Sequence, residues 1–585
     1  MAAALAPVFR LGEVRIEPDA LRIEGPSGTV HVEPRVMSVL VMLATRAPHP
    51  VSREELLQSV WGGAFVTDAV LTRCISLLRQ HLGDARDEPR FIETLSKHGY
   101  RMIAPVSAVE SPAIGSATAG TAVHSLAVLP LVNRSGSPAD ELLADGLTDL
   151  LITTLAAIAS LRVISRTSSM RYKRSEQSLT QIAAELKVDH VVEGSVLHAD
   201  GRVKVLVQLI EAATDTHRWS ASYERELVDI IGLLNEIASA VADGISACLT
   251  PADVARLALA PVLPRDAVAA YLRGRHFWAQ RTPEALREAE AAFASCNRAA
   301  PRFAPGWSGR ADCHVVLGLY GIDPPGPAAS HAREYSERAC TLDPESGEAE
   351  ATRGAVRLFF DWDFAAAEAA FERALALSPS HAVTYLSYGD LRLFAGDVGE
   401  ALRLIRHALA LSPFDPGLSM NLGDYLVFGR RLHEGVDQFR RTLDMAPRFV
   451  PARARLAEAL ALLGEHGQAR QEAERALYEA SSPLRVHETL AFVIAASGEV
   501  KEALPRLLAL EAARATRYVS AWELARAYAV MGFTDAALRW LRQAVDERCP
   551  IALVTRQDAA FDALREDPRF KAIVATLGLP ALRQG

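Results

Sequence analysis

The chain has 585 residues, of which 50% are hydrophobic and 23% are charged, a composition typical of folded globular proteins. Its length predicts about three to five domains, and its net charge of −8 excludes general affinity for nucleic acids along the whole chain. The six cysteines lie far apart and include no CxxC pair, so we expect reduced thiols and neither disulfides nor a metal site.

The sequence predicts a cytoplasmic protein without a membrane segment. The first residues, MAAALAPVFRLGEVRIE, contain neither a basic start nor a long apolar run, so we expect no signal peptide. The longest apolar runs, at 36–44 and 150–161, are shorter than the roughly 18–20 residues that a membrane span requires. They fit buried helices instead.

Residues 1–106 are predicted to form a domain of short strands, three helices and a closing hairpin. Residues 9–32 alternate apolar and polar positions between Gly, Pro and Asp, which is typical of three or four strands. The helices are expected at 34–47, 52–61 and 67–83. The stretch FIETLSKHGYRM (91–102) then predicts a hairpin with a basic turn, in which Gly99 supplies the unusual backbone angles.

Local signals define the ends and the inner faces of these helices. Pro34 suits a helix start, and Ser52 and Glu55 form a capping box because each side chain can satisfy the other's backbone N–H. The third helix is expected to stop at Gly83. Its inward face is predicted to consist of Leu71, Ile75, Leu78 and Leu82.

This order of elements, with its spacing and the Gly-Tyr pair of the hairpin, resembles the winged helix-turn-helix domain of OmpR/PhoB-type transcriptional regulators. The matching segments are VSREELLQSVWG (51–62), LTRCISLLRQHLGD (71–84) and FIETLSKHGYRM (91–102). The position of the domain in the chain is similar to that in CadC/ToxR-like regulators, but here a polar stretch takes the place of their membrane span. The resemblance implies binding to double-stranded DNA.

The resemblance and the helical periodicity together indicate which side chains would contact DNA. A major groove admits one α-helix, and the residues that read bases must point away from the buried stripe of that helix. The exposed side of the third helix carries Thr72, Arg73, Ser76, Arg79 and Gln80. We expect the first three at base edges and Arg79 at a phosphate. The hairpin residues expected against the minor groove or the backbone are Lys97, His98 and Arg101.

Two features of this domain favour modest affinity or a different role. Residues 1–106 contain 12 Lys or Arg and 12 Asp or Glu, so the domain is neutral. Cys74 and Leu77 stand in the third helix where relatives often carry polar or basic residues. We therefore expect few phosphate contacts, a shallow salt dependence, and tight binding only by two copies on adjacent half-sites. An exposed helix face with two arginines is also compatible with an ordinary solvated surface.

Residues 107–124 are expected to be a flexible linker, because 13 of these 18 residues are Ala, Gly, Ser, Thr or Pro. Residues 125–248 then predict a mixed α/β domain, in which Asp200-Gly201 signals a type I′ turn. The segments LAVLPLVNRSG, ADGLTDLL, VISRTSS, VVEGSV and QLIEAATDTHRWSASYER are similar to the TolB N-terminal-like domain found beside TPR arrays in bacterial regulators and cyclases. The resemblance does not indicate what this domain binds.

The sequence indicates no catalytic site. Asp145-Gly146 and the run RTSS (166–169) form either a polar ligand site or a helix cap and a loop. The chain contains no glycine-lysine pair, no HExxH motif and no GxSxG motif. We therefore expect no enzymatic activity, no cofactor and no bound metal.

Residues 249–266 are expected to be a second linker, because prolines bracket a short helix there. Residues 267–585 predict a TPR solenoid, since positions recur every 34 residues. The recurring positions are Pro379, Pro413 and Pro447; Gly396, Arg430, Gly464, Gly498 and Gly532; Ala367, Ala401, Gly435, Ala469, Ala503 and Ala537; and Ala355, Gly389, Gly423, Ala457, Ala491 and Ala525. The concave face of such a solenoid can bind a peptide or a protein partner. Arg392, Tyr425, Arg455 and Tyr528 either face this groove or, for the tyrosines, pack between helices.

The sequence thus predicts a multidomain protein with a winged helix-turn-helix (α+β) domain, a small α/β domain and an all-α TPR superhelix. The expected function is that of a bacterial transcriptional regulator whose array and middle domain bind a protein, peptide or small-molecule signal. A homodimer on DNA is compatible with this function. The alternative is a TPR scaffold whose winged helix docks proteins instead of DNA, and a third hypothesis is an accessory subunit of an enzyme.

Overall fold

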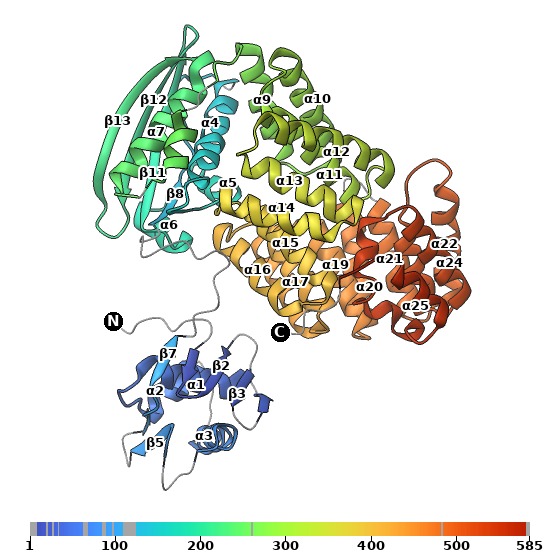
Figure 1. Cartoon of the computed structure of the whole chain (residues 1–585). Coiled ribbons are helices and arrows are strands. Elements are labelled where there is room, and N and C mark those ends of the chain that lie inside the picture. The colour runs from blue at the N-terminus through green and yellow to red at the C-terminus, as the bar shows by residue number, and fades with distance from the viewer. Residues whose placement is uncertain are drawn as a thin grey trace. The chain divides into compact units, whose positions relative to one another are not determined.

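The computed structural model describes residues 9–18, 22–25, 28–32, 34–61, 68–84, 89–95, 99–108, 124–137, 139–247, 249–258, 261–480 and 484–580. The chain divides into two compact units, Met1–Gly120 and Thr121–Gly585 (Figure 1). Among the helices that the structure describes, none is both long and apolar enough to cross a membrane.

The first unit combines a five-stranded antiparallel sheet, three helices and a two-stranded hairpin. The sheet has the order β4-β3-β2-β1-β7. Its strands are β1 (Phe9–Leu11), β2 (Val14–Glu17), β3 (Arg22–Gly25), β4 (Gly28–His31) and β7 (Val106–Ala108). The helices are α1 (Pro34–Arg46), α2 (Arg53–Trp61) and α3 (Asp68–Leu82), and the hairpin consists of β5 (Ile92–Leu95) and β6 (Gly99–Met102). This arrangement confirms the predicted winged-helix architecture.

The strand β7 lies partly in the stretch that the sequence predicts as a linker, 107–124. Phe9 pairs with Ala108 and Leu11 pairs with Val106, so the chain returns to the sheet after the hairpin. Phe9 and Leu11 are completely buried, and β7 gives their strand a second neighbour. The remainder of the predicted linker, 109–123, lies outside the described residues.

Two predicted local signals are present in this unit. The backbone N–H of Glu55 donates to Ser52 Oγ over 3.1 Å, which caps the start of α2. Gly99 has a φ of +106°, and a Cβ atom there would lie 2.1 Å from the carbonyl oxygen of Val51. Only glycine fits this position, where the hairpin approaches the residues before α2 through the bridge between Val51 and Tyr100.

The second unit begins with an α/β part whose sheet has the order β10-β8-β11-β12-β13, with β9 also paired to β11. The strands are β8 (His124–Val128), β9 (Val132–Asn133), β10 (Leu161–Val163), β11 (His190–Ala199), β12 (Arg202–Glu211) and β13 (Thr216–Glu226). The helices are α4 (Ala139–Ala156), α5 (Arg166–Ser169), α6 (Leu179–Leu186) and α7 (Ile230–Gly244). β8 runs parallel to β10 and β11, whereas β11, β12 and β13 are antiparallel. Asp200 and Gly201 have φ values of +52° and +76°, as the predicted type I′ turn requires.

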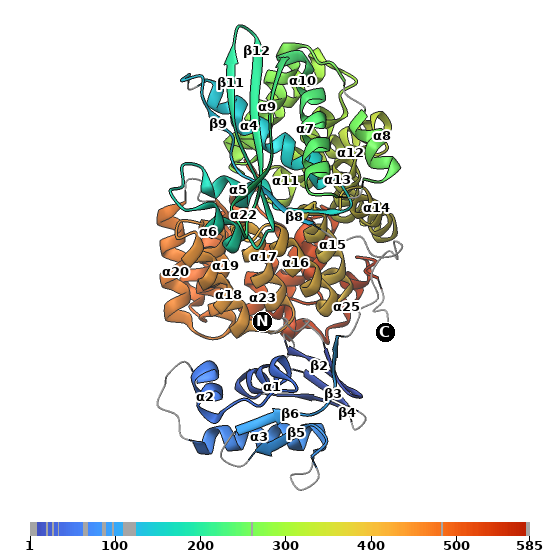
Figure 2. The ribbon, with the colours of Figure 1, turned by 90° about the vertical axis from the view of Figure 1, so that its left-hand side faces the viewer.

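One face of this sheet is covered by α4 and α7 (Figure 2). On the opposite face α6 covers part of β8 and β11, where Ala127 and Val191 are completely buried, and β12 is exposed to solvent. Val203, Val205 and Val207 of β12 are completely buried, whereas the residues between them are exposed. This alternation is typical of an antiparallel sheet with one solvated face.

Residues 249–266, predicted as a linker, contain the helix α8 (Pro251–Ala258). Thr250 and Asp253 cap its start, since the N–H of Asp253 donates to Thr250 Oγ1 at 3.1 Å and the N–H of Thr250 donates to Asp253 Oδ2 at 2.9 Å. Leu257 and Leu263 are buried in the same hydrophobic core as α4 and α7. This stretch therefore packs on the α/β part, where Arg256 also donates to the carbonyl oxygen of Ala157 at 2.6 Å.

The rest of the second unit is an array of antiparallel helix pairs, α9 with α10 through α23 with α24. The helices are α9 (Arg265–Trp278), α10 (Pro283–Ala299), α11 (Ala304–Leu319), α12 (Pro325–Leu342), α13 (Gly347–Val356), α14 (Phe364–Leu377), α15 (Ala382–Ala395), α16 (Val398–Leu411), α17 (Pro416–Phe428), α18 (Leu432–Met445), α19 (Val450–Leu462), α20 (His466–Glu479), α21 (Leu484–Ala496), α22 (Val500–Ala513), α23 (Ala521–Val530) and α24 (Thr534–Asp546). The predicted TPR architecture is confirmed.

The 34-residue spacing corresponds to repeated geometry. The turns inside the pairs use left-handed residues at this spacing, with φ of +88° at Gly396, +82° at Gly464, +79° at Gly498 and +78° at Gly532. Arg430, at the same spacing, has a φ of +65°. The small residues Ala367, Ala401, Ala469, Ala503 and Ala537 are completely buried, because the paired helices approach each other closely at these positions.

The array ends in 3₁₀ turns at Pro550–Val554 and Ala559–Leu564 and in α25 (Pro568–Ala575). Arg556 donates to the carbonyl oxygen of Phe394 at 3.0 Å, so this segment lies against the end of α15. Asp562 accepts from both terminal nitrogens of Arg430, at 2.7 and 2.6 Å. The end of the chain therefore contacts helices more than 130 residues earlier in the sequence.

Hydrogen bonds join the α/β part directly to the array. The N–H of Ser165 donates to the carbonyl oxygen of Leu411 at 2.8 Å, and the N–H of Phe414 donates to Ser168 Oγ at 3.0 Å. Arg275 of α9 donates to Asp149 of α4 at 2.8 Å. The second unit is consequently one continuous body from the sheet to α25.

Candidate nucleic-acid interface

The helix α3 presents the predicted face to solvent. Thr72, Arg73, Ser76 and Gln80 are exposed. Leu71, Ile75, Leu78 and Leu82 are buried, as their spacing predicts, and α3 ends before Gly83, whose φ is +65°. Ser76 Oγ donates to the carbonyl oxygen of Thr72 at 2.9 Å, and its hydroxyl oxygen can still accept a hydrogen bond. These four exposed residues are all polar, and Arg73 is the charged residue among them.

Arg79 is held by the hairpin instead of extending into solvent. Its guanidinium donates to the carbonyl oxygen of Ile92 and to Thr94 Oγ1, each at 2.8 Å. These contacts attach α3 to β5. In this arrangement the side chain positions the recognition helix and the hairpin relative to each other.

The hairpin residues are only partly described. Arg101 donates to Glu93 Oε2 through Nε at 2.9 Å and through a terminal nitrogen at 2.5 Å, across the strands β5 and β6. Its side chain is 38% exposed, so part of the guanidinium still faces solvent. Lys97 and His98 lie outside the described residues.

Cys74 and Leu77, which stand where relatives often carry polar or basic residues, belong to the core side of the helix. Cys74 is 6% exposed, and Leu77 packs against the hydrophobic core of the unit. They therefore do not interrupt the exposed face, and this support for a protein-docking role is removed.

Asp84 is a positioning residue that the sequence reasoning missed. Its Oδ1 accepts from the backbone N–H groups of Arg90 and Phe91 at 2.6 and 3.1 Å, and its Oδ2 accepts from the N–H of Ile92 at 2.8 Å. One carboxylate thus fixes the start of the hairpin beside the end of α3. The signal for it was the Gly-Asp pair that ends the helix, because Asp is favoured where local backbone N–H groups need an acceptor.

Several polar residues proposed for a ligand site in the α/β part contact neighbours within the chain. Asp145 contacts Lys173 at 2.6 Å. Ser168 and Ser169 are completely buried, and Ser168 joins the array as described above. A Cβ atom on Gly146 would lie 2.6 Å from the side chain of Leu272, so this glycine allows close packing of α4 on α9. Neither predicted alternative fits, because Asp145 and Gly146 lie inside α4 and residues 166–169 form the short helix α5.

The residues suggested for the TPR groove are also engaged within the chain. Tyr425 is 1% exposed and donates to Asp390 at 2.8 Å, and Tyr528 donates to Glu511 at 2.7 Å. Both tyrosines pack between helices, the second of the two predicted possibilities. Arg392 contacts Glu368.

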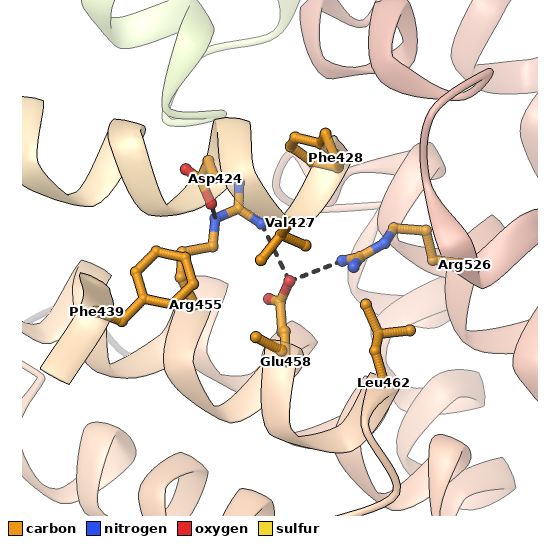
Figure 3. A pocket seen from close by; sticks show the side chains of 9 residues that line it. Asp424, Val427, Phe428, Phe439, Arg455, Glu458, Leu462 and Arg526 are labelled. Carbon is orange, nitrogen blue, oxygen red and sulfur yellow. Dashed lines mark hydrogen bonds and ion pairs between the residues drawn. The ribbon is translucent and has the colours of Figure 1, made fainter. Parts of the chain in front are cut away.

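Arg455 belongs to a buried network of charges beside a small cavity of about 10 Å³ (Figure 3). Glu458 accepts from Arg455 at 3.0 Å and from Arg526 at 2.9 Å, and Asp424 lies 3.4 Å from Arg455. Burial alone would raise the pKa of Glu458, but Arg526 and Arg455 hold it below its usual range. Burial raises the pKa of Asp424 to about 6. Because the arginines lining the cavity are matched by carboxylates, the cavity offers no unpaired cation to an anionic ligand.

Two family models match this chain, one in each unit. Residues 27–102 match the model described as "Transcriptional regulatory protein, C terminal". Residues 122–239 match the model described as "HilA/YgeH-like transcriptional regulator, second domain". The first match covers α1 to α3 and the hairpin, and the second covers most of the α/β part.

Individual relatives agree with these matches. The transcriptional regulator HilA of Salmonella typhimurium is 28% identical over 381 residues, which cover 64% of this chain and 66% of HilA, just under two thirds of its length. The transcriptional activator CadC of Escherichia coli is 38% identical over 101 residues, which cover 17% of this chain and 20% of CadC. The putative adenylate cyclase 3 of Rhizobium meliloti is 36% identical over 132 residues, which cover 23% of this chain and 22% of that protein.

The geometry of the first unit and both family matches indicate the same class of protein, a transcriptional regulator. The chain carries a winged-helix domain of the OmpR/PhoB type followed by a second domain of the HilA/YgeH type, and it is a relative of the HilA and CadC transcriptional regulators.

Proposed function

We propose that this protein is a cytoplasmic transcriptional regulator that reads double-stranded DNA with α3. The observation that carries the proposal is the combination of an exposed polar face on α3 with a hairpin fixed beside it in a domain of the regulator family. A helix presented in this way fits a major groove, and the adjacent hairpin then reaches the neighbouring backbone or minor groove.

The predicted DNA contacts divide into two groups. Thr72, Arg73, Ser76 and Gln80 are proposed to face the bases, and Arg73 is suited to a bidentate contact with a guanine edge. Lys97 and His98 are proposed to contact the backbone or the minor groove. Arg79 and Arg101 are proposed mainly to hold the hairpin, since both already bond to it.

The second unit is proposed to supply regulation. Its α/β part and array form one continuous body, so a protein, peptide or small molecule bound to either could act on the other. The array is proposed to bind such a signal at its concave face. Two copies on adjacent half-sites, about 34–36 Å apart, would compensate for the neutral charge of a single winged helix.

Selection of binding sites from a random pool of duplexes tests this function. The full chain is expected to enrich one motif, and the affinity for that motif is then measured by fluorescence anisotropy. Arg73→Ala should weaken binding by about 5- to 150-fold, the cost of one bidentate base contact. Arg10→Ala, which removes an exposed arginine of the same unit from β1, is the matched control and should leave the affinity unchanged.

A TPR scaffold is the competing proposal, and the neutral charge of residues 1–106 favours it. It predicts that no motif is enriched and that Arg73→Ala binds every duplex as weakly as the parent chain does. Enrichment of a motif that both variants bind equally would place the DNA contact on another surface.

A further inference from the structure

The strand β13 leaves an open edge on the sheet of the second unit. It is 11 residues long and pairs with β12 on one side, and no strand among the described residues pairs with its other side. In Figure 1 it is the outermost strand of the sheet. The free N–H and C=O groups along such an edge can pair with a strand of another chain. Many long edges are interrupted by proline, but β13 contains none. Its ladder with β12 shifts register between Leu209 and Ile210, so Arg218 has no partner residue on β12.

We propose that a second copy of this chain occupies this edge, with the two β13 strands antiparallel and centred on Ala221. The strand runs from Thr216 to Glu226, so a centre at Ala221 opposes Trp219 to Tyr223. It also places Arg218, the residue at the register shift, nearest to Glu224 of the other copy. The contact is isologous, as in most homodimers. Two sheets would join into one continuous sheet across the dimer axis.

The charges on the exposed face of β13 are complementary in this register. Arg218 of each copy lies opposite Glu224 of the other, and opposite charges directly across a strand pair are stabilising. Within one chain, Arg218 contacts Glu211 at 2.8 Å and Glu224 contacts Arg202 at 2.6 Å. In the dimer, Arg218 of each copy would lie between Glu211 of its own chain and Glu224 of the other chain. This contact would occur twice, once on each side of the dimer axis.

The aromatic residues on the other face are complementary as well. Trp219 of one copy lies opposite Tyr223 of the other, and both side chains are half-buried at the border of the core below the sheet. Within the chain their rings already adjoin, with centroids 6.3 Å apart. The second copy would cover their open sides, and cross-strand aromatic pairs stabilise antiparallel sheets. Arg225, which would lie opposite His217, is matched inside its own chain by Glu236 at 2.8 Å.

This inference deepens the proposed function, because two winged helices on adjacent half-sites require two copies of the chain. The dimer itself needs no DNA, so its test is separate from the test of DNA reading. Failure of the dimer would leave a monomeric reader of DNA, and failure of DNA reading would leave a dimer of unknown role.

The test measures the mass of the full chain without DNA by sedimentation equilibrium over a range of concentrations. The parent is expected to dimerise. Arg218→Glu and Glu224→Arg each place like charges at both crossings, so each should raise the dissociation constant of the dimer by about tenfold or more. An equimolar mixture of the two variants restores opposite charges at both crossings and should dimerise about as well as the parent.

The mixture separates the interface from damage within one chain, because mixing does not repair the contacts with Glu211 and Arg202. Leu206→Glu serves as a second control, since Leu206 is 37% exposed on the open face of the sheet and away from its edge. A parent that stays monomeric overturns the proposal. The proposal is also overturned if the dimer persists in both charge-reversal variants, or if their mixture stays monomeric. It is overturned as well if only Leu206→Glu loses the dimer.

Discussion

Two arginines of α3 that are six residues apart have different surroundings. Arg73 is exposed, whereas Arg79 donates to the backbone of Ile92 and to Thr94. Periodicity alone placed both on the outer side of the helix, because it cannot show that a hairpin 13 residues further along the chain returns to accept from one of them. The difference between the two residues therefore depends on tertiary structure.

Arg79→Ala should destabilise the first unit by about 1–2 kcal/mol, because two acceptors in the hairpin lose a charged donor. Arg73→Ala should change the free energy of unfolding by less than about 0.5 kcal/mol, as expected for an exposed residue. Urea titration followed by a signal from the first unit measures both. Equal effects of the two variants would show that Arg79 does not anchor the hairpin.

Glu488 of α21 should make the stability of the second unit depend on pH. Its side chain is 6% exposed, and burial raises its pKa from 4.5 to about 7. The folded state therefore binds the proton more tightly than the unfolded state, so this residue's contribution to stability is present below pH 4.5 and is lost as the pH rises to about 7.

Glu488→Gln should match the parent near pH 4.5 and exceed its free energy of unfolding at pH 8 by a margin on the order of 3 kcal/mol. Denaturant titrations of both proteins at the two pH values test this. Glu176→Gln, at an exposed position, is the control and should give no such difference. An equal difference in the free energy of unfolding between the variant and the parent at both pH values would show that burial does not raise the pKa of Glu488.

At the level of elements, the helices and their pairing could be predicted because their signals are local. Pro34, Ser52 and the 34-residue spacing each specify a helix start or a repeat without reference to the rest of the chain. The strand β7 and the packing of α8 could not be predicted in this way. Val106–Ala108 is too short for a pattern, and its partner β1 is almost one hundred residues earlier.

The candidate site shows the same limit. The inward residues of α3 and the outward Thr72, Arg73, Ser76 and Gln80 follow from spacing. The anchoring role of Arg79 depends on hydrogen bonds to the hairpin, which no pattern of side chains reports, whereas the Gly-Asp pair at the end of α3 was a local signal for Asp84.

Arg526 should be a strong contributor to the stability of the array. It is 2% exposed and lies 2.9 Å from Glu458, 2.9 Å from Glu523 and 2.8 Å from Asp558. Arg526→Met would leave these carboxylates buried without their cation, at a cost of about 3–5 kcal/mol. Arg470→Met, which removes a more exposed arginine that contacts Glu502, should cost less than about 1 kcal/mol. Denaturant titration monitored by helical circular dichroism measures the free energy of unfolding of both variants. Equal losses in the two variants would show that the buried contacts of Arg526 contribute no more to stability than the exposed contacts of Arg470.

At the scale of the whole molecule, the chain combines a small reader with a large continuous body. The first unit holds the polar face of α3, and the second holds the array, its packed α/β part and the open edge of β13. In the proposed dimer, joining the two larger bodies would bring two winged helices to one operator without a large basic surface on either.

The measurement that tests DNA reading most directly is recovery of genomic fragments bound by the intact chain in cells of its source, beside the double variant Arg73→Ala/Lys97→Ala. We predict a small number of sharp peaks that share a repeated motif, and their loss in the double variant. Uniform recovery of fragments that the double variant leaves unchanged would contradict DNA reading by α3 and the hairpin.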